Sequence, residues 1–111
     1  MLLLENLFKL LFGHALADFV LQPEAMGYGK NRNDKIHDKE HSLFPVWWYW
    51  LTAHALVHGG IVYFITNSLL LGMIEFVIHW ATDFAKCEGW ISTHQDQGIH
   101  IGCKVVYAFF L

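Results

Sequence analysis

Four apolar segments of the chain each carry two histidine or aspartate residues that are separated by four positions. The pairs are His14 and Asp18, His54 and His58, His79 and Asp83, and Asp96 and His100. Residues at this spacing lie on one face of a helix, about one turn apart, so both side chains can reach one point. Helices bind metal ions through imidazole and carboxylate groups at this spacing. We therefore predict that these eight residues are metal ligands.

The composition is unusually apolar for a chain of 111 residues. Hydrophobic residues make up 55% of the chain and charged residues 15%, and the mean hydropathy is +0.34. These values are typical of an integral membrane protein, for which membrane lipid is the expected partner. The formal net charge of -3 argues against nucleic acid as a partner. The length predicts one domain, residues 1–111.

The hydrophobic runs predict four helices, over residues 2–22, 46–66, 69–86 and 94–111. Residues 23–45 are rich in charged side chains and glycine, which predicts a polar loop between the first two helices. Apolar runs of about 20 residues are long enough to cross a bilayer. The predicted fold is therefore an all-α, four-helix transmembrane bundle that forms a single integral membrane domain.

Basic residues lie on one side of this predicted bundle. Lys30, Arg32, Lys35 and Lys39 fall in the first loop on that side, and Lys86 ends the third predicted helix beside the second loop. The positive-inside rule places these loops in the cytoplasm, which predicts a location in the bacterial inner membrane. Counted from the same side, most of the paired residues lie within about 5 to 12 Å of the cytoplasmic face. This shared depth favours one metal centre over four separate pairs.

Histidine and aspartate ligands inside a helical bundle suit zinc, with iron or manganese as alternatives. An ion with an open position lowers the pKa of its bound water and makes a nucleophile at neutral pH. Asp18 and Asp83 are the candidate catalytic bases, and Lys86 is a candidate for binding a phosphate. At the cytoplasmic face, the expected substrate is a lipid head group or a polyprenyl phosphate. The predicted function is a metal-dependent hydrolase.

Further polar residues are predicted to support the ligands. Glu75 lies one turn before His79, and we expect it to form a buried ion pair with Lys9 or Lys104. Gln22 and Gln97 are expected to form hydrogen bonds to the ligands.

Two other interpretations of the same residues stay open. Hydrogen-bonded His–Asp pairs could hold the helices together without metal, in a non-enzymatic membrane protein such as a partner-binding phage or host factor or an ion carrier. Alternatively, the histidines at positions 14, 54, 58 and 79 could bind haem in a redox module, although the aspartates suit hard metals better. The short last helix also predicts a homo-oligomer, in which a second copy covers the bundle.

Together the four motifs resemble one protein family. They read His14-Ala-Leu-Ala-Asp18-Phe-Val-Leu-Gln22, His54-Ala-Leu-Val-His58, His79-x-x-x-Asp83-x-x-Lys86 and Asp96-Gln97-x-x-His100. This combination is similar to the small bacterial and phage membrane proteins grouped as domain of unknown function 3307, over most of the chain outside residues 23–45. The resemblance implies an integral membrane protein and supplies no activity. The likeness of that family to small membrane-bound metal-dependent hydrolases is an analogy.

Overall fold

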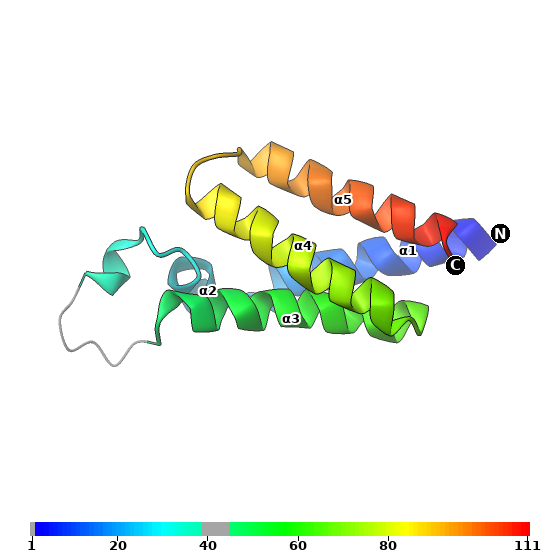
Figure 1. Cartoon of the computed structure of the whole chain (residues 1–111), viewed down its shortest axis with the longest axis horizontal. Helices are drawn as coiled ribbons and strands as arrows, with labels where there is room; N and C mark the ends of the chain where they lie inside the picture. The colour runs from blue at the N-terminus through cyan, green and yellow to red at the C-terminus, as the bar shows by residue number, and fades with distance from the viewer. Residues whose placement is uncertain (1, 39–44) are drawn as a thin grey trace.

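A computed structural model describes residues 2–38 and 45–111, and every regular element in these ranges is helical. Four long helices run along the long axis of an elongated molecule, with both chain termini at the same end (Figure 1). The long helices are α1 (Leu2–Ala15), α3 (Trp47–Thr66), α4 (Leu69–Cys87) and α5 (Thr93–Phe109). The short segments are the π-helix η1 (Leu16–Val20), α2 (Glu24–Gly29) and the 3₁₀-helix η2 (Lys35–His37).

Short sequence signals set the ends of the long helices. Asn67 adopts a left-handed φ of 55° after α3, and its N–H donates a hydrogen bond to the Tyr63 carbonyl oxygen. The Ser68 side chain then accepts a hydrogen bond from the Leu71 N–H and caps α4. At the start of α5, Ser92 and Gln95 form a capping box. These caps fix the register of α4 and α5, and therefore the direction of the polar side chains on them.

The segment predicted as one helix over residues 2–22 has two parts. α1 ends at Ala15, and the five residues of η1 continue it with the wider π-helical turn. Such a turn inserts one extra residue and changes the direction of the following side chains, often at a functional site. Asp18 lies in this turn and is buried. The segment predicted as a loop contains α2 and η2, and its residues 39–44 lie outside the described part of the chain.

Two glycines bring α3 and α4 into close contact. A Cβ atom on Gly59 would lie 2.8 Å from the carbonyl oxygen of Gly72, and a Cβ atom on Gly72 would lie 2.9 Å from the carbonyl oxygen of Gly59. A side chain at either position would push the two backbones apart. One residue from Gly59, the ring of His58 stacks on that of His79 with their centroids 3.6 Å apart. The glycines therefore allow the histidines of the two helices to meet.

The interior combines a small apolar cluster with many buried polar groups. Leu10, Val62, Tyr107 and Ala108 form the apolar cluster. The other fully buried large side chains include four histidines, two aspartates, a glutamate and Lys104. Buried polar groups are costly unless they are paired or bind a ligand. The bundle therefore gathers the side chains whose burial costs the most free energy in one central region.

No helix within residues 2–38 and 45–111 is both long enough and apolar enough to cross a membrane. α1 has 14 residues and so spans about 21 Å, against roughly 30 Å for the hydrocarbon core of a bilayer. α4 is longer but carries the charged residues Glu75, Asp83 and Lys86. This finding contradicts the predicted transmembrane bundle and the inner-membrane location with cytoplasmic loops, and neither is retained.

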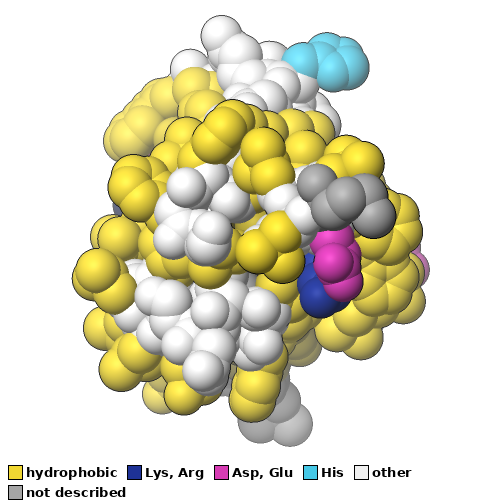
Figure 2. Space-filling view, turned by 90° about the vertical axis from the view of Figure 1, so that its right-hand side faces the viewer, with side chains coloured by type: hydrophobic (Ala, Val, Ile, Leu, Met, Phe, Trp, Pro, Cys, Tyr) yellow, Lys and Arg dark blue, Asp and Glu magenta, His cyan; other side chains and the backbone are white. Residues whose placement is uncertain are grey.

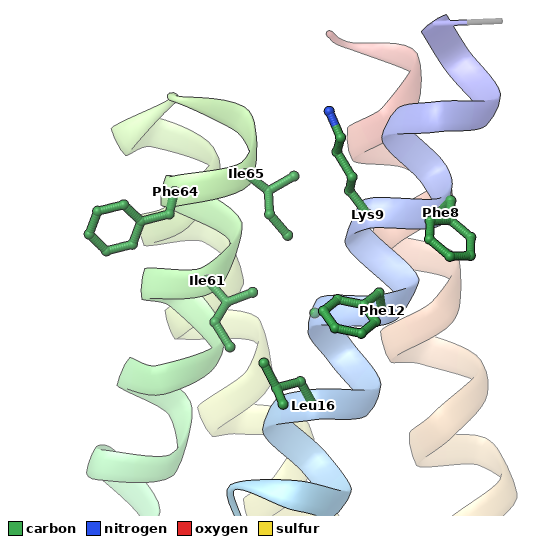
Figure 3. Close-up of a pocket in the computed structure, with 8 residues that line it drawn as sticks. Phe8, Lys9, Phe12, Leu16, Ile61, Phe64 and Ile65 are labelled. Atoms are coloured by element: carbon green, nitrogen blue, oxygen red, sulfur yellow. The ribbon is translucent and has the colours of Figure 1, made fainter.

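The hydrophobic side chains that suggested membrane spans lie largely on the outer surface. They cover most of the end of the molecule where the termini lie (Figure 2). An apolar groove of about 290 Å³ runs between α1 and α3, and the side chains of Phe12, Ile61 and Ile65 point toward it (Figure 3). Phe12 is 61% exposed, whereas His14, two positions later, is 5% exposed. The paired residues thus point inward, away from the apolar surface.

Candidate metal centre

All eight predicted ligands are buried between the four long helices, with exposed fractions from 0% to 7%. They come in pairs from α1 and η1 (His14, Asp18), α3 (His54, His58), α4 (His79, Asp83) and α5 (Asp96, His100). Their rings and carboxylates form one continuous cluster. The His14 ring lies 5.4 Å from that of His58, and the His79 ring lies 4.0 Å from that of His100, between ring centroids. The structure therefore brings the four pairs to one place.

Asp18 lies at the centre of the tightest group. Its Oδ1 atom lies 3.1 Å from Nε2 of His54, 3.2 Å from Nε2 of His58 and 3.9 Å from Nε2 of His79. We call these four residues the Asp18 group, and one ligand atom from each lies within 4.8 Å of all the others. Zinc bonds of about 2.0 to 2.2 Å place tetrahedral ligand atoms a little over 3 Å from one another. A small contraction of the Asp18 group therefore fits one ion.

His79 has two ring nitrogens that the protein itself does not satisfy. Its Nδ1 and Nε2 atoms are both buried, and neither has a hydrogen-bond partner among the described residues. Its Nδ1 atom lies 3.4 Å from Oε1 of Glu75. A buried polar atom without a partner costs about 1 to 3 kcal/mol. A metal ion in the Asp18 group would remove this cost, because Nε2 lies on the side of the ring that faces Asp18.

Asp83 borders the same group through one of its two oxygens. Its Oδ2 atom lies 3.3 Å from Nε2 of His54 and 3.7 Å from Nε2 of His79. The same oxygen accepts a hydrogen bond of 2.8 Å from Nζ of Lys30, a side chain that is 4% exposed. Asp83 is therefore a possible fifth ligand that a buried lysine already holds in place.

Lys30 is a site residue that sequence reasoning placed in a solvated loop. It follows α2, which packs on the first part of α3 (Figure 1). A Cβ atom on Gly29 would lie 2.5 Å from the Trp50 ring, so the glycine allows the close contact between the two segments. No local pattern distinguishes Lys30 from Arg32 or Lys35. Its role depends on Asp83, 53 positions away, and only the folded chain shows it.

Gln97 joins His14 to the Asp18 group. Its Nε2 atom donates a hydrogen bond of 2.7 Å to Oδ2 of Asp18, and its Oε1 atom lies 3.0 Å from Nε2 of His14. His14 itself is 3.7 Å from Asp18 Oδ2. His14 is thus placed beside the candidate ion site, while Gln97 supports the carboxylate as predicted. Gln22 instead donates to the backbone oxygen of Asp18 at 3.3 Å.

Glu75 forms a buried network below His79. Its carboxylate accepts hydrogen bonds from Nζ of Lys104 at 2.5 Å and from the Tyr107 hydroxyl at 2.8 Å. Of the two lysines predicted as partners, Lys104 is confirmed, whereas Lys9 pairs with Glu5 on the surface at 3.3 Å. Sequence reasoning missed Tyr107, whose one signal is its position one turn after Lys104. The network fixes the carboxylate that lies nearest to Nδ1 of His79.

Burial and charge keep the cluster in the protonation state that binds metal. Desolvation lowers the pKa of His58 to about 4 and also lowers the pKa of His14 and His79. Burial raises the pKa of Asp18, but hydrogen bonds from His54, His58 and Gln97 outweigh it and lower the pKa strongly. In Asp83 the charges of Lys30 and Lys86 likewise outweigh burial and lower the pKa. Neutral imidazoles and ionised carboxylates are the forms that ligate metals.

We expect the metal-free protein to lose stability as the pH falls below about 6.5, the ordinary pKa of histidine. The unfolded chain then binds protons on histidines such as His58, which the folded protein leaves neutral down to about pH 4. The free energy of unfolding should fall by up to about 1.4 kcal/mol per pH unit for each such histidine. Urea denaturation of chelator-treated protein at pH 7 and pH 5 measures the difference.

The exposed His94 provides a control for this pH dependence. A His94→Ala variant should show the same fall between pH 7 and pH 5 as the unaltered chain. Below about pH 4, protonation of Asp18 and Asp83 should add a further loss, because their lowered pKa values stabilise the fold only while they are ionised. Equal free energies of unfolding at pH 7 and pH 5 would show that the buried histidines take up protons in the folded state.

Fold and site together define a small all-helical protein whose helices enclose a cluster of histidine and aspartate side chains. The model of a family described as a protein of unknown function, DUF3307, matches residues 6–110. The chain belongs to this family, and the match includes all eight predicted ligands. No curated protein and no solved structure matches the chain.

Proposed function

We propose that the protein binds a divalent metal ion in the Asp18 group and uses it to hydrolyse a phosphoester. The observation that carries this proposal is the convergence of four buried ligand atoms, one of which, Nε2 of His79, has no hydrogen-bond partner in the described chain. Three imidazoles and one carboxylate suit zinc, with iron or manganese as alternatives. Haem fits less well, because the His58 and His79 rings stack at 3.6 Å and leave no room for a macrocycle between them.

An ion that added a water molecule to these four protein ligands, by becoming five-coordinate, would act as a Lewis acid and lower the pKa of that water to about 7. In the proposed reaction the water oxygen bonds to phosphorus, and the bond from phosphorus to the leaving alcohol oxygen breaks. Of the two candidate bases, Asp83 is the better placed, because its Oδ1 accepts no hydrogen bond from any residue that the structure describes. Asp18 already receives hydrogen bonds at both oxygens. Asp83 would take the proton of the water and pass it to the leaving oxygen, so Asp83 is ionised again at the end of the reaction.

Lys86 is positioned to contact the substrate. Its Nζ atom lies 3.4 Å from Oδ1 of Asp83, and its side chain is 26% exposed, in contrast to the buried Lys30. Burial lowers its pKa, but the nearby Asp83 and Asp96 carboxylates outweigh this and raise the pKa, so Lys86 stays charged at neutral pH. A charged lysine between the ion and solvent can bind a phosphate oxygen as the substrate enters.

The test is phosphate release by purified protein loaded separately with zinc, iron(II) or manganese. Two substrates are offered, p-nitrophenyl phosphate and a short polyprenyl phosphate, because the lipid substrate was predicted from a membrane location that the structure does not support. We expect release that a chelator abolishes and added metal restores. Asp83→Asn should lower the rate at least about 100-fold, the usual contribution of a general base.

Glu88→Gln is the matched control, because Glu88 is an acidic residue near the end of α4 that pairs with Arg32 outside the cluster. It should keep the full rate. If metal-loaded protein releases no phosphate from either substrate, the hydrolase part of the proposal is wrong. Metal binding is then judged separately by metal content.

A further inference from the structure

We infer that Asp83, Asp96 and His100 bind a second metal ion beside the first, with the Asp83 carboxylate bridging the two. This inference rests on the proposed function, because Asp83 also borders the Asp18 group. It extends that function from one ion to a two-ion centre. In that centre Oδ1 of Asp83 would bind the second ion instead of accepting a proton, and the attacking water would lose its proton to solvent before it reacts, because the ions lower its pKa. The residues come from the last turns of α4 and the first turns of α5, which one short connection joins (Figure 1).

The three residues have the geometry of a ligand set. One ligand atom from each lies within 4.8 Å of the other two, and the residues are 1%, 0% and 1% exposed, in sequence order. Nε2 of His100 lies 3.1 Å from Oδ1 of Asp96, one turn before it on α5. The capping box at Ser92 fixes the first turn of this helix and so the direction of Asp96. The set is therefore held in place before any ion binds.

The two oxygens of Asp83 face different ligands. Oδ2 lies beside His54 and His79 of the Asp18 group, at 3.3 and 3.7 Å. Oδ1 is buried and accepts no hydrogen bond from the described residues. Two-metal sites hold their ions about 3.5 to 4 Å apart, a separation that one carboxylate can bridge. An unsatisfied oxygen on the side of Asp96 is what a bridging role requires.

The ammonium group of Lys86 lies beside the two carboxylates that would bind the second ion. Its Nζ atom lies 3.4 Å from Oδ1 of Asp83 and 3.8 Å from Oδ2 of Asp96. Both distances exceed the usual 2.7 to 3.2 Å of an N–H···O hydrogen bond, so the ammonium is held loosely by charge. The lysine side chain is flexible and partly exposed. It can turn toward solvent and leave both carboxylates to an ion.

Glu75, His79 and His100 form another ligand set, but its carboxylate is not paired with a lysine that can move away. Both oxygens of Glu75 already accept hydrogen bonds, from Lys104 and Tyr107. The Lys104 side chain is 1% exposed and has no route to solvent. An ion there would stand beside a buried ammonium that cannot leave. The set that contains Lys86 is therefore the better candidate for a second ion.

A second ion would define the substrate class more closely. Two-metal sites stabilise both the attacking and the leaving oxygen of an in-line displacement at phosphorus. The additional positive charge suits a substrate that carries two negative charges, as a phosphate monoester does. Lys86, once displaced from Asp83 and Asp96, stays close enough to contact the same phosphate.

Calorimetric titration of metal-free protein with zinc, repeated with manganese, tests this inference. We expect two binding events per chain, one tight and one weaker. Asp96→Asn should remove the weaker event and keep the tight one. Lys86→Met should strengthen the weaker event at least about tenfold, since it removes a competing cation, and leave the tight event unchanged. A lysine that merely stabilised the fold would show no such gain.

Lys35→Met is the matched control, because Lys35 is an exposed lysine of η2, and it should leave both events unchanged. If Asp96→Asn does not fold, as judged by circular dichroism, His100→Gln replaces it. One binding event in both the unaltered chain and Lys86→Met would reject the second site and leave the first intact. No binding event in either would reject the proposed function itself.

Discussion

Alanine in place of both His54 and His58 is expected to lower metal affinity more than about 100-fold, since even the loss of one residue that supports a ligand costs about 10- to 100-fold. Both Nε2 atoms lie within 3.2 Å of Oδ1 of Asp18, so the variant removes two of the four ligands in the Asp18 group. Metal content after gel filtration in zinc-buffered solution, measured by mass spectrometry, gives the result. The unaltered chain should retain one to two ions, and the variant almost none.

Exposed His94 on α5 again supplies the control, and His94→Ala should retain the full metal content. The double variant also leaves Asp18 with fewer hydrogen bonds, so its circular dichroism and melting temperature must be recorded without metal. Metal retained by a folded double variant would mean that the ion binds elsewhere. Absence of metal in the unaltered chain as well would favour His–Asp pairs that hold the helices together through hydrogen bonds alone.

The cluster could be predicted from sequence because its spacing is local. His54 and His58 lie on one face of any helix, and the same holds for the other three pairs. Their shared depth within four predicted helices was a further sequence signal, and the structure brings the pairs together. Whether they bind metal stays a prediction. Spacing could not show how Asp18 becomes central, because that depends on the π-helical turn of η1.

The transmembrane prediction was wrong because hydropathy counts residues and ignores where they point. The segment 2–22 is apolar overall, yet its regular α-helix ends after 14 residues, and Phe12 faces outward while His14 faces inward. In α4 the charged residues Glu75 and Asp83 are at most 1% exposed. Oppositely charged partners inside the bundle offset the free energy that their burial costs. Those partners, Lys104 and Lys30, lie 29 and 53 positions away. Sequence periodicity carries no signal at such distances.

Replacing Lys104 by methionine is expected to lower the free energy of unfolding by about 3 to 5 kcal/mol, because it leaves a carboxylate buried without its counter-charge. Glu75 is 0% exposed and accepts hydrogen bonds from Lys104 and Tyr107. The double variant Glu75→Gln/Lys104→Met removes both charges and should recover most of this loss. Urea denaturation of the metal-free proteins measures all three values.

The surface pair of Glu5 and Lys9 is the matched control, with side chains 60% and 53% exposed. Lys9→Met should cost less than about 1 kcal/mol, as exposed ion pairs contribute little. A similarly small cost for Lys104→Met would show that Glu75 takes up a proton or reaches water when its partner is lost.

The double variant Glu75→Gln/Lys104→Met also tests whether the Glu75 network affects metal affinity as well as stability. Oε1 of Glu75 lies 3.4 Å from Nδ1 of His79 without a hydrogen bond between them, and the negative charge of the carboxylate favours the tautomer that carries its proton on Nδ1 and leaves Nε2 free to bind an ion. We therefore expect the stable double variant to bind zinc about 10- to 100-fold more weakly, the usual cost of losing such a partner. Competition with a chromophoric chelator measures the affinity. Recovered stability with unchanged affinity would mean that the Glu75 network only holds α4 against α5, and that the stacked rings of His58 and His100 orient His79 instead.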